Sequence, residues 1–156
     1  METDAEIIEQ FVRCFEKNSE QQPVHRQTSR DKLDSIYSKL RGRLPPLFEE
    51  LLLTFRWAGV DLERFYLFAN PLGDDLSGFE NEIFKDHGLS SVLIEGGFIQ
   101  FGKAEEFSNY DPICFNTRKR LKDGDCLIVQ LDHEEILCNF RLKEVTQVSS
   151  FFSRIC

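Results

Sequence analysis

The sequence predicts a single α+β domain with a mainly antiparallel sheet, and three observations support this prediction. The 156 residues suit one hydrophobic core, because a chain of this length buries roughly 70% of the surface that it exposes when unfolded. The first third of the chain carries amphipathic helical patterns, whereas phenylalanine-rich and β-branched segments dominate the later part. No long helical pattern separates those later segments, which favours antiparallel pairing over parallel β-α-β units.

Three helical patterns are visible before residue 56. Thr3 and Glu6 form a capping box, and the apolar residues that follow have the spacing of one helix face. These residues are Ile7, Ile8, Phe11, Val12 and Phe15. A polar linker follows, so we expect residues 1–19 to dock on the main body as an added arm. A second capping box, Thr28 with Asp31, predicts a helix closed by Gly42, and "LPPLFEELLLTF" predicts a third that packs with it over the sheet.

The rest of the chain predicts strands with two further helices. The expected strands are 64–68, 98–102, 110–116, 126–132 and 135–142. A short helix is expected to begin at Ser77, in "SGFENEIFKDHG". The apolar residues Val145, Val148, Phe152 and Ile155 recur at helical spacing, which predicts a C-terminal helix.

The charge of the chain disfavours binding to nucleic acid. Asp and Glu number 27 against 19 Lys and Arg, a formal net charge of −8. A negative field repels phosphate backbones and favours a basic protein partner. The two small basic clusters, "RGR" at 41–43 and "RKRLK" at 118–122, are expected to lie in solvated loops.

Targeting and redox signals point to the cytoplasm. The N-terminus "METDAEIIEQ" has no secretory pattern, and no apolar run approaches the roughly 20 residues that span a bilayer. The five cysteines lack a C-x-x-C pair and are expected to be reduced thiols. Cys114, Cys126 and Cys138 lie in predicted strands and are expected to pack as small hydrophobic side chains.

No motif in the sequence predicts catalytic chemistry. The polar run Asp132–Glu135 follows the alternating segment "CLIVQL", and we interpret it as the turn of a hairpin. It lacks the second histidine of a zinc-binding H-E-x-x-H motif. Asp74 and Asp75 lack the spacing of a calcium loop and are expected in an exposed acidic loop. The prediction is therefore a protein without a catalytic site, cofactor or metal.

The order of these segments resembles the SUKH superfamily, which includes the yeast cell-wall assembly regulators of the Smi/Knr type. The resemblance covers residues 31–156 and leaves 1–30 as an N-terminal helical extension of a single domain 1–156. Its segments, in order, are "SKLRGRLPPLFEELLLTF", "RFYLF", "GGFIQFG", "YDPICFN", "DCLIVQLDHEEIL" and "VTQVSSFF". The resemblance implies helices packed around a curved, mainly antiparallel sheet, without catalytic machinery, and many bacterial members are immunity proteins that neutralise toxins.

The expected function is therefore a cytoplasmic, non-enzymatic protein-binding module, with immunity against a toxin as the leading hypothesis. Acidic residues in loops are the candidate partner contacts, because loops at the ends of a sheet are free to meet a partner. They are Asp74, Asp75, Asp132, Glu134 and Glu135. Two alternatives stay open: a cellular scaffold or regulator of the Smi/Knr type, and a hydrolase or metal-dependent enzyme built on Asp111, Asp132 and His133.

Overall fold

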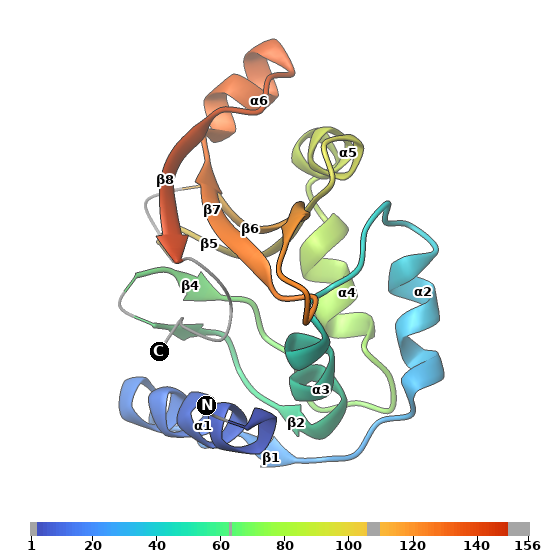
Figure 1. The fold of residues 1–156 in the computed structure, drawn as a ribbon, viewed down its shortest axis with the longest axis vertical. Helices are drawn as coiled ribbons and strands as arrows, with labels where there is room; N and C mark the ends of the chain where they lie inside the picture. Colours follow the sequence, from blue (N-terminus) through green and yellow to red (C-terminus); the bar gives the residue numbers. More distant parts are fainter. Residues whose placement is uncertain (1–2, 63, 106–109, 150–156) are drawn as a thin grey trace.

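The computed structural model describes residues 3–62, 64–105 and 110–149 and confirms the α+β fold (Figure 1). Six strands form one antiparallel sheet in which each strand pairs with its neighbour in the sequence, in the order β3-β4-β5-β6-β7-β8. They are β3 (Val60–Asp61), β4 (Tyr66–Leu67), β5 (Phe98–Lys103), β6 (Pro112–Arg120), β7 (Cys126–Leu131) and β8 (Glu144–Ser149). β1 (Val24–His25) and β2 (Phe55–Arg56) form a separate antiparallel pair.

The helices of the described ranges lie before the six-stranded sheet and between its strands. They are α1 (Asp4–Asn18), α2 (Asp34–Tyr37), α3 (Pro46–Thr54), α4 (Ser77–Phe84), α5 (His87–Glu95) and α6 (His133–Asn139), with the 3-10 helix η1 (Arg30–Leu33) before α2. None of the helices in these ranges combines the length and the apolar character that crossing a membrane requires.

Helices bury both faces of the central strands. Phe101, Phe115 and Ile128 belong to the larger hydrophobic cluster, together with residues of α3 and α4. Cys114 and Val129, the neighbours of Phe115 and Ile128 in the sequence, point the other way into a second cluster with residues of α5 and α6. Burial on both faces explains why these strands read as nearly continuous apolar runs.

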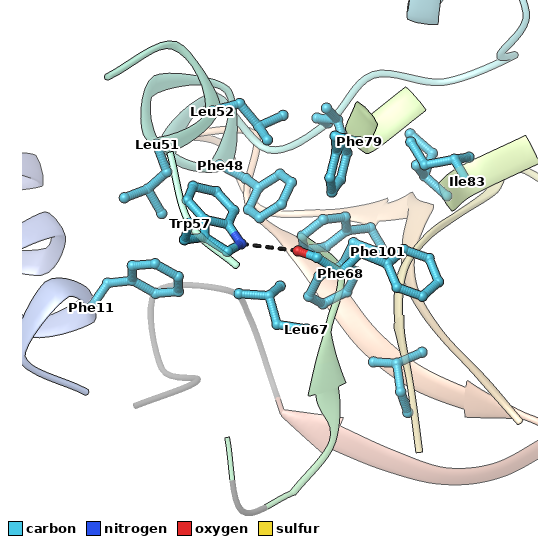
Figure 2. Close-up of a cluster of buried hydrophobic side chains, with 14 of the residues drawn as sticks. Phe11, Phe48, Leu51, Leu52, Trp57, Leu67, Phe68, Phe79, Ile83 and Phe101 are labelled. Carbon is cyan, nitrogen blue, oxygen red and sulfur yellow. Dashed lines mark hydrogen bonds between the residues drawn. The ribbon is translucent and has the colours of Figure 1, made fainter. Parts of the chain in front are cut away.

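Aromatic side chains fill the larger cluster (Figure 2). Phe101 and Phe115 stack at a centroid distance of 3.9 Å, and Phe48 of α3 meets both rings edge-on. Trp57, which is 4% exposed, donates from Nε1 to the carbonyl of Phe68 at 2.9 Å. Gly102 allows β4 to approach β5, because a Cβ at this position would lie 2.3 Å from the Tyr66 carbonyl oxygen.

The capping box at Thr3 is confirmed, but the second predicted helix is much shorter than expected. The Thr28 hydroxyl accepts a hydrogen bond from Arg56, and Ser29, which precedes η1, makes no side-chain cap bond. Only η1 and the four-residue α2 therefore form between Thr28 and Gly42. The predicted strand 64–68 is likewise reduced to β4.

Two predictions in the last quarter of the chain are wrong. The segment 135–142 does not form a strand after a turn, because residues 133–139 form α6, with Asp132 as its N-cap. The predicted C-terminal helix is replaced over residues 144–149 by β8, which pairs with β7. Phe152 and Ile155, which completed that prediction, lie outside the described residues. The helix α5 was not predicted from the sequence, except for its first two residues, His87 and Gly88, which end the predicted segment "SGFENEIFKDHG".

Candidate functional site

The acidic run that opens α6 is a helix start and not a hairpin turn. A carboxylate oxygen of Asp132 accepts hydrogen bonds from the backbone N–H groups of Glu134 (2.9 Å) and Glu135 (3.2 Å). The first N–H groups of a helix lack acceptors within the helix, and this carboxylate is the acceptor for two of these groups. The backbone N–H of Asp132 donates to the carbonyl of Lys143 at 2.9 Å, which joins the start of α6 to the start of β8.

Asp111 lies beneath the same helix start and holds its first residue. Its Oδ1 accepts from the backbone N–H of His133 at 3.0 Å and lies 2.6 Å from the ring Nδ1, while its Oδ2 accepts from Gln130 Nε2 at 2.8 Å. Burial favours a higher pKa for Asp111, but the hydrogen bonds from His133 and Gln130 outweigh it and lower the pKa below the ordinary value of 3.8. Asp111 is therefore an ionised anchor for α6.

Asp111, Asp132 and His133 also bring three metal-ligating side chains together. One ligand atom from each lies within 4.8 Å of the others. An ion bound at Asp111 Oδ1 would compete with two N–H donors of His133, and an ion at the capping oxygen of Asp132 would compete with the helix start. The contacts of this cluster are accounted for by a structural role, although its residue types suit a divalent metal.

An exposed apolar surface follows the cluster. Figure 1 shows α6 at one end of the molecule, with β8 returning from it along the sheet. Four large apolar side chains are exposed on α6, on the turn after it and on β8; they are Leu137, Phe140, Leu142 and Val145, here called the α6–β8 surface. Leu137 and Leu142 approach the two ends of α5, since a Cβ at Gly88 would lie 3.0 Å from Leu137 Cδ2 and a Cβ at Gly96 would lie 2.2 Å from Leu142 Cδ1.

Phe140 has an unfavourable conformation as well as an exposed ring. It terminates α6 with φ 53° and ψ 36°, in the left-handed region that favours glycine or asparagine. The residue is 75% exposed. An aromatic residue in this region of backbone conformation is an outlier, and its ring does not recover the cost by burial.

The five predicted partner contacts do not form one surface. Asp132, Glu134 and Glu135 lie together at the start of α6, next to the α6–β8 surface. Asp74, 99% exposed at its side chain, pairs with Arg26 at 2.8 Å, just after β1 at the opposite end of the molecule (Figure 1). Asp75 is exposed and accepts from the backbone N–H of Ser77 at 3.0 Å. Hydrogen bonds from Ser77 lower its pKa.

Cys114 and Cys126 are buried, as expected for small hydrophobic side chains, whereas Cys138 is not. Burial raises the pKa of Cys114, and it raises that of Cys126 to about 11. Neither thiol is therefore suited to act as a nucleophile at neutral pH. Cys138 is exposed on α6 and not buried in a strand, which corrects the prediction for that residue.

Sequence reasoning missed the α6–β8 surface because it placed residues 135–142 in a strand. In a strand, alternate residues of "ILCNFRL" would face the core, and an exposed Phe140 would not be expected. In comparisons with known proteins, no protein-family model and no curated protein matches the sequence.

Proposed function

We propose that this chain is a non-enzymatic protein-binding module that uses the α6–β8 surface as its contact face. The observation that supports the proposal is Phe140, a residue that has a strained backbone and is 75% exposed. Strain retained at a position that the fold alone would give to glycine is typical of functional surfaces. Exposed aromatic side chains are also the commonest anchors of protein interfaces.

The neighbourhood of Phe140 has the composition of an interface. Three apolar side chains, Leu137, Leu142 and Val145, accompany the ring. Charged and exposed residues surround them; these are Glu134, Arg141, Lys143 and Glu144. An apolar centre with a charged rim is the usual anatomy of a protein contact, in which the centre supplies affinity and the rim supplies specificity and association rate.

We further propose that the partner is a toxin neutralised in the cytoplasm. Support comes from the resemblance to the SUKH superfamily and from the net charge of −8, which attracts a basic toxin domain. The four cysteines in the described ranges carry free thiols, in keeping with a reducing compartment. A cellular scaffold or regulator of the Smi/Knr type would use the same surface on a different partner.

A metal-dependent hydrolase is the alternative of a different class, and Asp111, Asp132 and His133 favour it by their proximity. Titration of the purified protein with Zn²⁺ distinguishes the two classes. A binding module whose cluster anchors α6 should keep its melting temperature when Zn²⁺ is added. A rise in melting temperature that is abolished by His133→Ala would favour the enzyme, because ligands that bind the native state stabilise it.

The experiment that tests the binding module compares tagged wild-type protein with Phe140→Asp in purifications from the native host. The matched control is Leu72→Asp, which changes another exposed apolar residue to the same carboxylate. We expect one near-stoichiometric partner with wild type and Leu72→Asp and its loss with Phe140→Asp, since anchor residues account for much of the binding energy. Recovery of the same partner with Phe140→Asp would exclude the α6–β8 surface as the contact.

Identification of the partner then decides between immunity and regulation. Immunity requires that the partner is toxic when expressed alone and that co-expression of this chain restores growth. A housekeeping protein as the partner would instead favour a cellular regulator.

The acidic residues are tested separately with two charge reversals of equal size. Glu134→Lys lies beside the α6–β8 surface, whereas Asp74→Lys lies at the opposite end of the molecule. With a basic partner at low salt, we expect Glu134→Lys to slow association more than Asp74→Lys, because rim charges steer the encounter. Equal slowing would mean that only the net charge matters.

A further inference from the structure

We propose that a pocket between the two basic clusters binds a small molecule that carries a phosphate group. Both clusters are predicted to lie in solvated loops, but the prediction for 118–122 is wrong in part, because residues 118–120 form the end of β6. The structure brings the two clusters together. Four arginines line the pocket: Arg41, Arg43, Arg118 and Arg120. Its volume is about 440 Å³, within the usual range of small-ligand sites.

The pocket forms where the segment after α2 meets the end of β6, beside the turn between β6 and β7. Arg120 joins the two segments. Its guanidinium donates to the carbonyls of Arg43, Thr117 (3.0 Å) and Gly124 (2.7 Å). These contacts fix the geometry of the pocket without neutralising the charge of Arg120, because carbonyl groups are dipoles and not ions.

The other three arginines are also held in place before a ligand arrives. Arg41 pairs with the carboxylate of Glu95 at 2.9 Å, and Arg118 donates to the backbone carbonyl of the same residue at 3.2 Å. Arg43 lies 4.3 Å above the ring of Tyr37 and 3.7 Å from Glu49. Side chains that are already ordered lose less conformational entropy when they bind a ligand.

The charge of the pocket is positive although the chain as a whole is acidic. Glu49 is the single carboxylate in the lining; it is 5% exposed and also pairs with Arg30 at 3.2 Å. Within the described ranges, no carboxylate lies at ion-pairing distance from Arg118 or Arg120. An anion that enters the pocket would therefore meet two guanidinium groups that lack an acidic partner.

The chemistry of the lining favours a phosphate ester. Guanidinium groups match the oxygens of phosphate with paired hydrogen bonds, and several of them suit a dianion better than a single carboxylate. Leu44 and Pro46 supply an apolar wall for an organic part. Gly97, with φ +80°, leaves room for Arg118, since a Cβ there would lie 2.8 Å from Arg118 Nε.

The test uses the intact protein with two probes, adenosine monophosphate and inorganic phosphate, in calorimetric titrations at about 0.15 M ionic strength, where the Debye length is about 8 Å. We expect one site that Arg118→Gln weakens at least about tenfold, as loss of a charged hydrogen-bonding partner does. Arg13→Gln is the matched control, because it makes the same charge change on the exposed surface of α1. It should change the affinity less than about twofold, since distant surface charges are screened.

A second variant and a second measurement keep the test decisive if Arg118→Gln fails to fold. Arg41→Gln removes one exposed ion pair, so the protein should still fold. This variant should also weaken binding of the probes, as Arg118→Gln does. In the wild-type protein, the amide NMR signals of Gly97 and Thr117 should shift during the titration. Tighter binding of the nucleotide than of phosphate would assign the site to a phosphate ester, and equal binding would assign it to free phosphate. Absence of binding by both probes, or equal affinity in the pocket and control variants, would overturn the proposal.

Discussion

Phe140 is expected to lower the stability of the fold while it supports partner binding, and the substitution Phe140→Gly tests both effects. Phe140→Gly should stabilise the protein by about 1 kcal/mol, because glycine adopts the left-handed conformation without the cost that a Cβ imposes. The free energy of unfolding in urea measures this gain. In the purification described above, the same variant should lose its partner, as an activity-stability conflict requires.

Phe140→Ala is the control, because it removes the ring and keeps the Cβ. Its free energy of unfolding should stay within about 0.5 kcal/mol of wild type, since the ring is exposed. A Phe140→Gly protein less stable than wild type would show that the ring stabilises the fold, and the argument from strain would fail.

Asp111 should contribute stability at neutral pH that is lost in acid. Its pKa in the folded protein is lowered by the hydrogen bonds from His133 and Gln130, against the effect of burial. The ionised form therefore stabilises the fold at pH values above the ordinary pKa of 3.8. This contribution to stability decreases as the pH falls through the lower pKa of the folded state. The effect adds to those of other carboxylates, so a variant is needed to isolate it.

Asp111→Asn is that variant. At pH 7 it should cost about 1–2 kcal/mol, because a charged acceptor of several hydrogen bonds becomes neutral. Urea unfolding between pH 7 and pH 2.5 should show this difference decreasing toward acid. A difference that stays constant over the whole range would mean that the charge of Asp111 does not stabilise α6.

The helix α6 shows why part of the candidate site could not be predicted from the sequence. The apolar parts of β5, β6 and β7 were predicted because their apolar runs have no competing interpretation, and burial on both faces explains those runs. The polar end of β6, residues 117–120, was not predicted as strand. "EILCNFRL" suits a strand or a short helix equally well by apolar pattern. The choice depends on Asp132 and Asp111, which both accept hydrogen bonds from backbone N–H groups at the helix start. Asp111 is 21 residues before Asp132, so local periodicity does not report its contact with the helix.

The basic pocket could not be predicted for the same reason. The clusters at 41–43 and 118–122 are separated along the chain by the strands and helices of the core, and each alone has the composition of a solvated loop. Only the fold brings them together. In contrast, α1 was predictable, because its capping box and its apolar face are local.

Substitutions of Asp132 test whether its N-cap hydrogen bonds stabilise α6. Asp132→Ala should destabilise the protein by about 1 kcal/mol, the usual cost of losing an N-cap, whereas Asp132→Asn should cost a few tenths, because its amide oxygen still accepts. Thermal and urea unfolding measure both. If Asp132→Asn were as unstable as Asp132→Ala, the charge and not the cap would hold the helix.

The packing of α1 determines whether residues 1–30 are a separable arm or part of the folding unit. Phe11 and Phe15 are buried, and their rings meet Trp57 edge-on at centroid distances of 6.1 Å and 6.5 Å. Both side chains belong to the same cluster as Phe101 and Phe115. A core shared in this way should unfold in one cooperative transition.

Phe15→Ala tests this cooperativity with the only tryptophan of the chain as the probe. Removing a fully buried ring should cost about 3–5 kcal/mol, whereas Glu9→Ala on the exposed face of α1 should change stability by less than about 0.5 kcal/mol. If α1 belongs to the folding unit, Trp57 fluorescence and far-UV circular dichroism will report the same urea midpoint in wild type, and Phe15→Ala will lower both midpoints together. A loss of helical signal or a change of fluorescence that precedes the main transition would instead show that α1 detaches while the sheet stays folded, which is the behaviour of an arm that a partner could displace.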